Sequence, residues 1–289
     1  MLAFFGVLIL TPDALLIRLI GSDPWTFLFW RGTLTMIGLG LMMLIRFRGK
    51  IVQRTLEIGA TGVLISVVFA INAVCFIVAL SHTTVANVLL IVSISPLISA
   101  LIGLVFLRDR LPLRTWVAIF VAIAGVAIIV EHGISAGTVA GDVAALGTAI
   151  GLGIHFNMVR AARPIDMTPA VGLSGLWSAA AGLVGASSLA FAPEQMGLAV
   201  VIGLLIMPLS FGLMTIAPKY ISAAEVSLML LLETVLAPIW VWLVLSERPN
   251  TQTLIGGAVV LAALLGHGIL SLIGQHRRRR HPIAPIVPI

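Results

Sequence analysis

Long apolar runs, separated by short polar connections, set the pattern of this chain. Each run is continuous rather than alternating and is close to the roughly 20 residues that a helix needs to cross a bilayer. The pattern therefore predicts an all-α integral membrane protein of ten transmembrane helices. We place them near residues 2–20, 25–45, 58–80, 84–107, 113–130, 142–160, 168–190, 197–216, 222–245 and 252–273.

The composition also indicates that the protein is surrounded by lipid rather than by water. The chain is 60% hydrophobic and 10% charged, whereas a soluble domain has about 25% charged residues. The first run has no charged segment before it and contains Asp13 and Arg18, so we expect a retained helix rather than a cleaved signal peptide. The single cysteine, Cys75, cannot support a disulfide framework or a cysteine metal site.

Basic residues collect in alternate connections, which indicates how the chain is oriented. Fourteen of the 17 Lys and Arg residues fall in the second, fourth, sixth and eighth connections and the C-terminal tail. Lys-rich and Arg-rich loops stay in the cytoplasm, so we expect a multi-pass protein of the bacterial inner (cytoplasmic) membrane with both termini in the cytoplasm. This placement accounts for the net charge of +6 without a nucleic-acid partner.

A shift of 138 residues overlays residues 87–124 on residues 225–262 without a gap. The pair Asp109-Arg110 falls on Glu247-Arg248, each at the same place after a long apolar run, and Pro96 falls on Thr234. The coincidence of an acidic-Arg pair is more informative than apolar matches, which are frequent in such a composition. The overlay indicates an internal repeat.

Each repeat would contain five helices, and because five is odd the second must enter the membrane upside down relative to the first. We expect residues 1–138 and residues 139–275 to form two inverted five-helix repeats. Residues 276–289 should form a basic, Pro-rich cytoplasmic tail without fixed structure. Inverted repeats are an architecture of secondary transporters, whose substrate site lies near the bilayer midplane, although channels use them as well.

The motifs in the two overlaid segments resemble those of a known superfamily. They are Asn87-Val-Leu-Leu, Ser95-Pro96, Leu107-Arg-Asp109-Arg110-Leu, Leu232-Glu233-Thr234-Val-Leu-Ala-Pro238 and Ser246-Glu247-Arg248-Pro249. Outside these segments, Gly141-Asp142 opens the second half in the same way. The chain resembles the drug/metabolite transporter superfamily and most closely its EamA-type carriers. Similar members include bacterial exporters of amino acids and related metabolites. One departure is Arg108-Asp109, where the family pattern usually has Gly-Glu.

Ionisable groups within apolar runs are candidates for function, because each is expensive to place in hydrocarbon. Glu233 lies at the middle of the ninth predicted helix, next to Thr234. Desolvation disfavours an ionised carboxylate, so proton binding near neutral pH becomes possible there. Glu233 is thus a candidate site for a proton or a substrate amine; the alternative is a carboxyl hydrogen-bonded between helices to hold the bundle together.

Asp13 and Arg31 lie at matching depths in the first two helices, roughly 10 Å from the outer end at about 1.5 Å per residue. They could pair as a structural ion pair across adjacent antiparallel helices. The alternative is that the Arg31 guanidinium binds a substrate carboxylate, a task that suits arginine.

Further mid-span polar and aromatic residues would complete a substrate cavity. They are Asn72, Ser93, Ser95, Trp177 and Thr234. Pro96, Pro208 and Pro238 also lie inside spans, where a proline removes a backbone hydrogen bond and permits a kink. We expect these three prolines to act as hinges that gate access.

The leading hypothesis is a secondary transporter of small metabolites, amino acids above all, that works as an exporter or exchanger by alternating access. Proton coupling through Glu233 is a separate expectation. The alternative is an uncoupled facilitator or channel for small solutes. The sequence contains no phosphate-binding loop, metal-ligand spacing or catalytic constellation, so we expect no enzyme activity, cofactor or metal. It assigns no oligomeric state.

Overall fold

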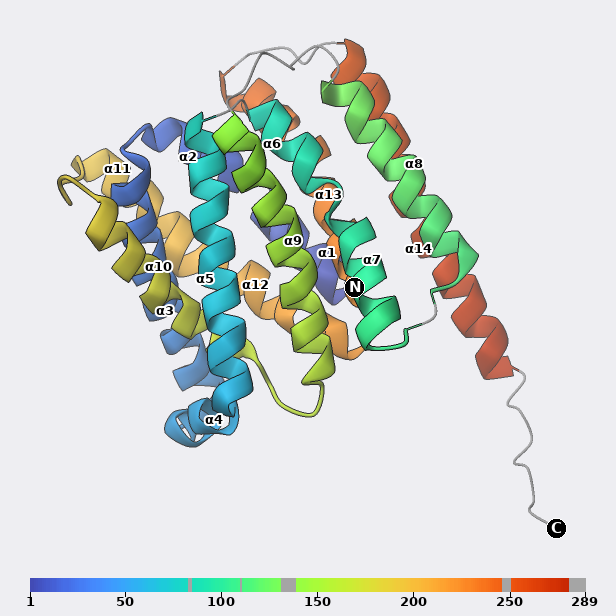
Figure 1. The fold of residues 1–289 in the computed structure, drawn as a ribbon, viewed down its shortest axis with the longest axis horizontal. Helices are drawn as coiled ribbons and strands as arrows, with labels where there is room; N and C mark the ends of the chain where they lie inside the picture. Colours follow the sequence, from blue (N-terminus) through green and yellow to red (C-terminus); the bar gives the residue numbers. More distant parts are fainter. Residues whose placement is uncertain (83–84, 110, 131–138, 246–250, 281–289) are drawn as a thin grey trace.

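The computed structural model of this protein is a bundle of helices (Figure 1). It describes residues 1–82, 85–109, 111–130, 139–245 and 251–280, and within these ranges it contains no strand. The first half of the chain forms α1 (Leu2–Leu10), α2 (Asp13–Ile20), α3 (Pro24–Phe47), α4 (Ile51–Glu57), α5 (Gly59–His82), α6 (Val85–Val92), α7 (Ser95–Phe106) and α8 (Leu113–Val130). The second half forms α9 (Val139–Ala161), α10 (Thr168–Gly185), α11 (Pro193–Val200), the π-helix η1 (Val201–Ile206), α12 (Met207–Ile216), the 3-10 helix η2 (Ala217–Lys219), α13 (Ala223–Leu245) and α14 (Thr251–Arg280).

Many of these helices are long and apolar enough to cross a membrane. Among the described residues seven segments qualify, namely Leu2–Ile20, Pro24–Phe47, Gly59–His82, Val88–Phe106, Val139–Ala161, Pro193–Lys219 and Ala223–Val244. Shorter apolar helices cover Leu113–Ile128 and Leu254–His267. The all-helical membrane architecture is therefore confirmed, while the count of ten spans stays a prediction.

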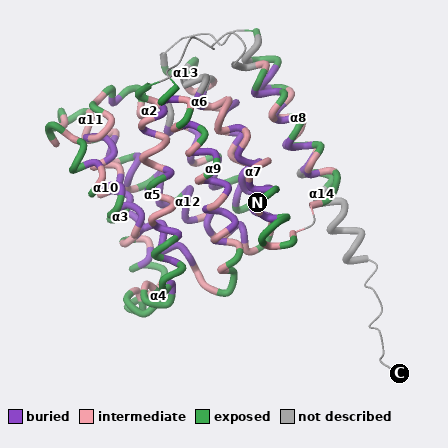
Figure 2. The backbone as a smooth tube through the Cα atoms, in the orientation of Figure 1, coloured by how far each residue is buried: buried purple, intermediate pink, exposed green. Residues whose placement is uncertain are grey.

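The outer surface of the bundle is apolar, as a lipid environment requires. Figure 2 shows exposed positions on the outward sides of the helices and buried positions between them. Large apolar side chains such as Leu41, Ile71, Phe106 and Val184 are exposed. In water such a surface would drive association, whereas in a bilayer it faces chains of matching polarity.

The two halves of the chain correspond element by element. Adding 138 to the bounds of α1–α2 gives those of α9 within a few residues, and the same shift carries α3 onto α10, α5 onto α11–α12, α6–α7 onto α13 and α8 onto α14. Helix packing shows the same correspondence. Helix α5 packs on α9, and the equivalent pair α12 and α1 also pack together. Likewise α5 packs on α10, and η1, which lies between α11 and α12, packs on α3. A two-repeat architecture accounts for this correspondence.

Equivalent helices run in opposite directions, as inverted repeats require. Along α3 and α10, Trp25 lies against Gly185, Phe29 against Gly182 and Gly32 against Gly175, so the two helices are antiparallel. The pair α8 and α14 behaves likewise, because Arg114 donates a hydrogen bond to the Leu270 carbonyl while Gly125 lies against Gly256.

The α3–α10 crossing depends on two glycines. A Cβ on Gly32 would lie 2.6 Å from the Gly175 carbonyl oxygen, and one on Gly175 would lie 2.5 Å from the Gly32 carbonyl oxygen. We expect Gly175→Ala to destabilise the protein by about 1–3 kcal/mol, because overpacking here pushes backbone against backbone. A lower thermal midpoint in detergent would report this. Gly40→Ala on α3 is the matched control, since no atom lies within 4 Å of its added Cβ; an equal loss in both variants would contradict the crossing.

The connections between helices gather at two ends of the bundle (Figure 1). One end carries Arg46, Arg54, Arg160, Arg163 and Lys219, and we call it the basic end. The other end carries Asp23, Asp142 and Glu194, and we call it the acidic end. The segregation of charge that the sequence predicts is thus present in three dimensions.

Two helices differ from their predicted course. The first predicted helix breaks between α1 and α2 at Thr11 and Pro12, because Pro12 has no N–H to continue the backbone ladder. The helix α13 runs as predicted and is continuous through Pro238, whose role as a hinge stays a prediction. The helix α14 extends to Arg280, so the tail predicted to lack structure from His276 is helical through its arginine run; residues 281–289 lie outside the described part.

Candidate functional site

A cavity of about 130 Å³ lies within the bundle, lined by residues from both halves of the chain. Helices α1, α2, α3, α5, α6 and α7 contribute from the first half, and α9, α10, α12 and α13 from the second. Its walls are mostly apolar, and they include Phe69, Phe76 and Phe211. The cavity is the size of a small solute and it occupies the position, between two repeats, where carriers of this architecture bind substrate.

The structure brings most of the predicted site residues together on this cavity. The residues that line it are Asp13, Arg31, Asn72, Ser93, Ser95, Glu233 and Thr234. They come from α2, α3, α5, the α6–α7 break and α13. Residues that are far apart in the chain thus share one small space, and their common role in substrate binding stays a prediction.

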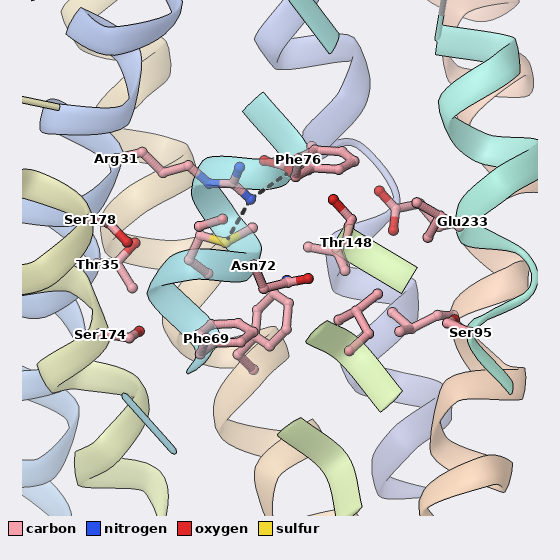
Figure 3. A pocket seen from close by; sticks show the side chains of 18 of the residues that line it. Arg31, Thr35, Phe69, Asn72, Phe76, Ser95, Thr148, Ser174, Ser178 and Glu233 are labelled. Atoms are coloured by element: carbon pink, nitrogen blue, oxygen red, sulfur yellow. Dashed lines mark hydrogen bonds and ion pairs between the residues drawn. The ribbon is translucent and has the colours of Figure 1, made fainter. Parts of the chain in front are cut away.

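Asp13 and Arg31 form an ion pair on one wall of the cavity. Arg31 Nη2 lies 3.0 Å from Asp13 Oδ2, and both side chains are largely buried, with 13% and 4% exposed. The same Nη2 lies 3.1 Å from Met207 Sδ. Both interpretations of Arg31 therefore have a geometric basis: the guanidinium pairs with Asp13 and also faces the space where a solute would lie (Figure 3).

Glu233 faces the same space from the opposite side, as Figure 3 shows. Its carboxyl makes no hydrogen bond or ion pair with any residue of the described part of the chain. Three ionisable groups, Asp13, Arg31 and Glu233, thus share the cavity, and two of them are already paired.

Three polar atoms on the cavity are buried without a partner among the described residues: Asp13 Oδ1, Asn72 Oδ1 and Ser95 Oγ. A buried polar atom normally has a hydrogen-bond partner, in the protein or in water. These atoms can accept hydrogen bonds from a bound solute or its water, and Ser95 can also donate one.

Two interrupted helices end at the cavity. The break between α1 and α2 precedes Asp13, and the break between α6 and α7 lies at Ser93 and Ile94, just before Pro96. The N-termini of α2 and α7 therefore open near the middle of the bundle, where their free N–H groups carry partial positive charge. Discontinuous helices of this kind build the binding sites of many secondary transporters.

The three predicted hinge prolines differ in their local structure. Pro96 lies in the first turn of α7, beside the α6–α7 break. Pro208 follows the π-helical η1, so the backbone is irregular just before it. No break in the helix occurs at Pro238. A break does occur at Pro12, which was not among the predicted hinges.

Trp177 does not line the cavity, so that expectation is corrected. Its side chain is 40% exposed, and its indole Nε1 donates a hydrogen bond of 3.0 Å to Ser66 Oγ on α5. Its position in the middle of a run could not reveal which face of α10 it occupies. Ser174 and Ser178, three residues before it and one after it, lie on an adjacent face of the helix and do line the cavity.

Several lining residues had no separate signal in the sequence. Thr35, Thr148, Ser174 and Ser178 look like ordinary small polar residues in apolar runs. The repeat supplies a signal for one of them: Thr148 is the counterpart of Leu10 under the 138-residue shift, and both line the cavity. Ser95 is in the same way the counterpart of Glu233, so the carboxyl is present in one repeat only.

His155 supports the cavity wall from behind. It is fully buried, its ring centroid lies 4.4 Å from that of Phe69, and Phe69 in turn contacts Phe211 at 4.8 Å. Phe69 and Phe211 both line the cavity. The histidine acts here as an aromatic packing residue, and among the described residues no group of His, Cys, Asp and Glu is arranged to hold a metal ion.

Asp166 anchors the connection between α9 and α10 at the basic end. Burial opposes its ionisation, but hydrogen bonds from the Thr168 hydroxyl and N–H, with the charges of Arg46 and Lys219, hold the pKa of this carboxyl below its ordinary value. Asp166 Oδ2 lies 3.1 Å from Arg46 Nη2. The contact fixes the start of α10 against the end of α3, away from the cavity.

Comparison with known proteins agrees with this architecture. A solved crystal structure superposes with a TM-score of 0.78 at 15% sequence identity, over 93% of this chain and 96% of that one, and shows the same fold. Curated proteins gave no match. The model of the EamA-like transporter family matches twice, over residues 1–131 and 139–268. The protein is therefore a membrane transporter of small solutes and belongs to the EamA-like transporter family.

Proposed function

We propose that this protein is a secondary carrier of small zwitterionic metabolites, in particular amino acids, that works by alternating access as an exporter or exchanger. The observation that carries the proposal is the placement of Arg31 and Glu233 on opposite sides of one small cavity (Figure 3). A guanidinium binds a carboxylate well, and a carboxylate binds an ammonium group. A zwitterion places these two groups at its two ends.

The remainder of the cavity suits such a substrate. Apolar side chains, among them Phe69, Phe76 and Phe211, form most of the wall and can pack against an aliphatic or aromatic side chain. A polyanionic solute is a poor fit, because Arg31 is the only basic residue among the described residues that line the cavity, and Asp13 already neutralises it. The exchange or export mode follows from the resemblance to amino-acid and metabolite exporters.

Flux into reconstituted vesicles tests the proposal. A thermal-shift screen of the 20 amino acids on the purified protein selects the radiolabelled substrate. We expect saturable uptake that rises several-fold when the vesicles are preloaded with the same unlabelled amino acid, because a loaded carrier reorients in both directions. Protein-free vesicles are the control. Linear flux that does not respond to preloading would contradict the carrier and support an uncoupled facilitator.

A further inference from the structure

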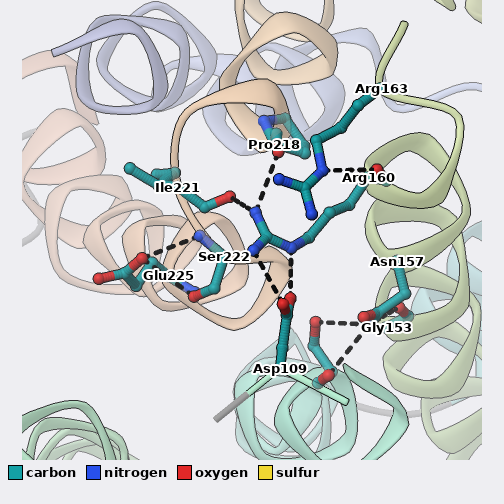
Figure 4. Close-up of polar contacts among 10 residues, drawn as sticks. Asp109, Gly153, Asn157, Arg160, Arg163, Pro218, Ile221, Ser222 and Glu225 are labelled. Carbon is teal, nitrogen blue, oxygen red and sulfur yellow. Dashed lines mark hydrogen bonds and ion pairs between the residues drawn. The ribbon is translucent and has the colours of Figure 1, made fainter. Parts of the chain in front are cut away.

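A second polar cluster lies at the basic end, separate from the cavity, and joins the two repeats. Arg160, at the end of α9, binds Asp109, just after α7, through Nε to Oδ2 and through Nη2 to Oδ1 at 3.1 Å (Figure 4). The Arg160 Nη1 group donates to the carbonyl oxygens of Ile221 at 2.6 Å and Pro218 at 3.2 Å. One guanidinium thus ties three chain segments together where the route from the cavity to the basic end would pass.

A second contact between the repeats lies about one helical turn closer to the cavity. Asn157, on the same helix as Arg160, donates through Nδ2 to the Ser99 carbonyl and hydroxyl oxygens, both at 3.0 Å. The Asn157 Oδ1 atom lies close to Gly103, where the Cβ of any other residue would be 3.0 Å from it. We call Asp109, Arg160, Asn157 and Ser99 the latch. Each of its two contacts joins a residue of the first repeat to one of the second.

Local backbone and capping interactions hold the latch residues in place. Arg108 has a φ of 53°, the left-handed conformation that glycine adopts most readily, and this turn directs Asp109 back toward α9. The family pattern that this chain resembles has glycine at that position. Across the latch, Ser222 and Glu225 cap α13 reciprocally, since Glu225 Oε2 accepts from the Ser222 N–H and hydroxyl while Ser222 Oγ accepts from the Glu225 N–H.

The inverted repeat predicts where a matching latch would lie at the acidic end, and the residues there are different. Under the 138-residue shift Arg160 corresponds to Ser22, Asn157 to Leu19 and Ser99 to Ala237. No ion pair or amide contact of this kind can form from these three residues. The counterpart of Asp109 is Glu247, which lies outside the described residues.

The part of the acidic end that corresponds to the latch under the 138-residue shift contains a cavity. A cavity of about 150 Å³ is lined there by Ser22 and Leu80, the counterparts of Arg160 and Pro218. Hydrogen bonds at this end lie on other helix pairs, as between Gln195 and the Ile20 carbonyl and between Thr26 and the Ser188 carbonyl. At equivalent positions the described residues of the two ends thus differ: the latch joins the repeats at the basic end, and a cavity lies at the acidic end.

We infer that the Asp109–Arg160 ion pair is the gate on the basic end, which must open for a solute to pass between the central cavity and that face. The inference rests on the proposed alternating access. It implies that the conformation described is closed at the basic end, the end that the positive-inside rule assigns to the cytoplasm. Arg160 and Asp109 act on transport by setting the balance of the two conformations and never touch the substrate.

Site-specific labelling tests the gate without any need to know the substrate. In a Cys75→Ser background, which has no other cysteine, Ala224→Cys reports on the buried space beneath the latch and Ser22→Cys reports on the acidic end. A membrane-impermeant maleimide is applied to each face, with inside-out and right-side-out vesicles. We expect Asp109→Asn and Arg160→Gln to raise Ala224→Cys labelling from the basic end about tenfold, a typical coupling between two states. They should lower Ser22→Cys labelling from the acidic end.

Two control variants separate gating from general loosening of the bundle. Asp109→Glu keeps the carboxylate and should label at close to the parent rate. Arg54→Gln removes a basic residue from the same end, where it pairs with Glu57 on an exposed helix, and should change neither position. Unchanged labelling in Asp109→Asn and Arg160→Gln, with preloading-stimulated flux intact, would overturn the gate and leave the carrier standing. Labelling that rises at both reporter positions would overturn alternating access itself.

Discussion

Glu233→Gln is expected to reduce transport of a zwitterionic amino acid about 10-fold to 100-fold in kcat/KM, because a hydrogen bond to a charged group contributes about 1.5–3 kcal/mol. The amide has nearly the shape of the carboxyl, so the wall of the cavity is preserved while its free negative charge is removed. Glu233 makes no hydrogen bond within the described residues, and the substitution therefore breaks none among them.

Proton coupling adds a second readout to the same variant. If Glu233 exchanges a proton with the cavity, the pH dependence of flux and any concentrative uptake should be lost in Glu233→Gln, since an amide does not titrate. Flux should be followed between pH 5 and 9 on vesicles with equal amounts of folded protein, checked by thermal shift. Flux and pH dependence that survive the substitution would show that the carboxyl serves the bundle rather than the substrate.

The repeat provides the matched control for Glu233. Ser95 holds the equivalent position in the first half and lines the same cavity, and its Oγ has no partner among the described residues. Ser95→Ala should reduce kcat/KM only a few-fold, because a neutral hydrogen bond contributes about 0.5–1.5 kcal/mol. Equal losses in both variants would argue against a special role for the charge.

Hydropathy and loop charge predicted the fold well because both follow directly from the order of the residues along the chain. The apolar runs mark where helices lie in the membrane, and the alternation of basic connections marks which end of the bundle each one reaches. The 138-residue overlay, found in one stretch of 38 residues, extends to helices α1 and α3 and their counterparts, where sequence identity gave no signal. Hydropathy could not locate the break at Pro12, since apolar residues continue on both sides of it and the two sides together read as one span.

The sequence identified the charged residues that line the cavity, whose role in binding stays a prediction, but it could not give the orientation of side chains around a helix. Asp13, Arg31 and Glu233 are unusual in hydrocarbon, and all three line the cavity. Trp177 was assigned by its depth alone, but depth does not say which face of a helix a residue occupies. Arg160 was counted only among the basic residues of the connections, and its contacts with Asp109, Pro218 and Ile221 depend on three segments that only the fold brings together.

The two polar clusters differ in chemistry, and the difference agrees with the roles proposed for them. The cavity leaves Asp13, Asn72 and Ser95 with unpartnered atoms, which suits a site that must accept and release a solute. The latch satisfies Arg160 with a carboxylate and two carbonyl groups, which suits a contact that must hold until a conformational change breaks it. A carrier needs both, since access to a site has to be closed on one side before it opens on the other.

Arg31→Met is expected to destabilise the protein by about 3–5 kcal/mol, the usual effect of leaving a buried charge without its partner. Asp13 would then be 4% exposed with no counter-ion. The double variant Asp13→Asn with Arg31→Met removes both charges, and we expect it to recover most of the thermal midpoint lost in the single variant. The charge swap Asp13→Arg with Arg31→Asp should likewise fold better than either single reversal; no recovery in either double variant would contradict the pairing.

Transport should not recover together with folding, and this difference identifies what Arg31 does. In the neutral double variant the cavity keeps Glu233 but has no cation, so a zwitterion loses the partner of its carboxylate, and we expect flux at least about tenfold below the wild type. A primary amine that lacks the carboxylate should bind the double variant and the wild type with similar affinity, as measured by thermal shift. Amino-acid flux that returns to the wild-type level with folding would mean that the ion pair only holds α2 against α3, and that the carboxylate of the substrate is bound elsewhere.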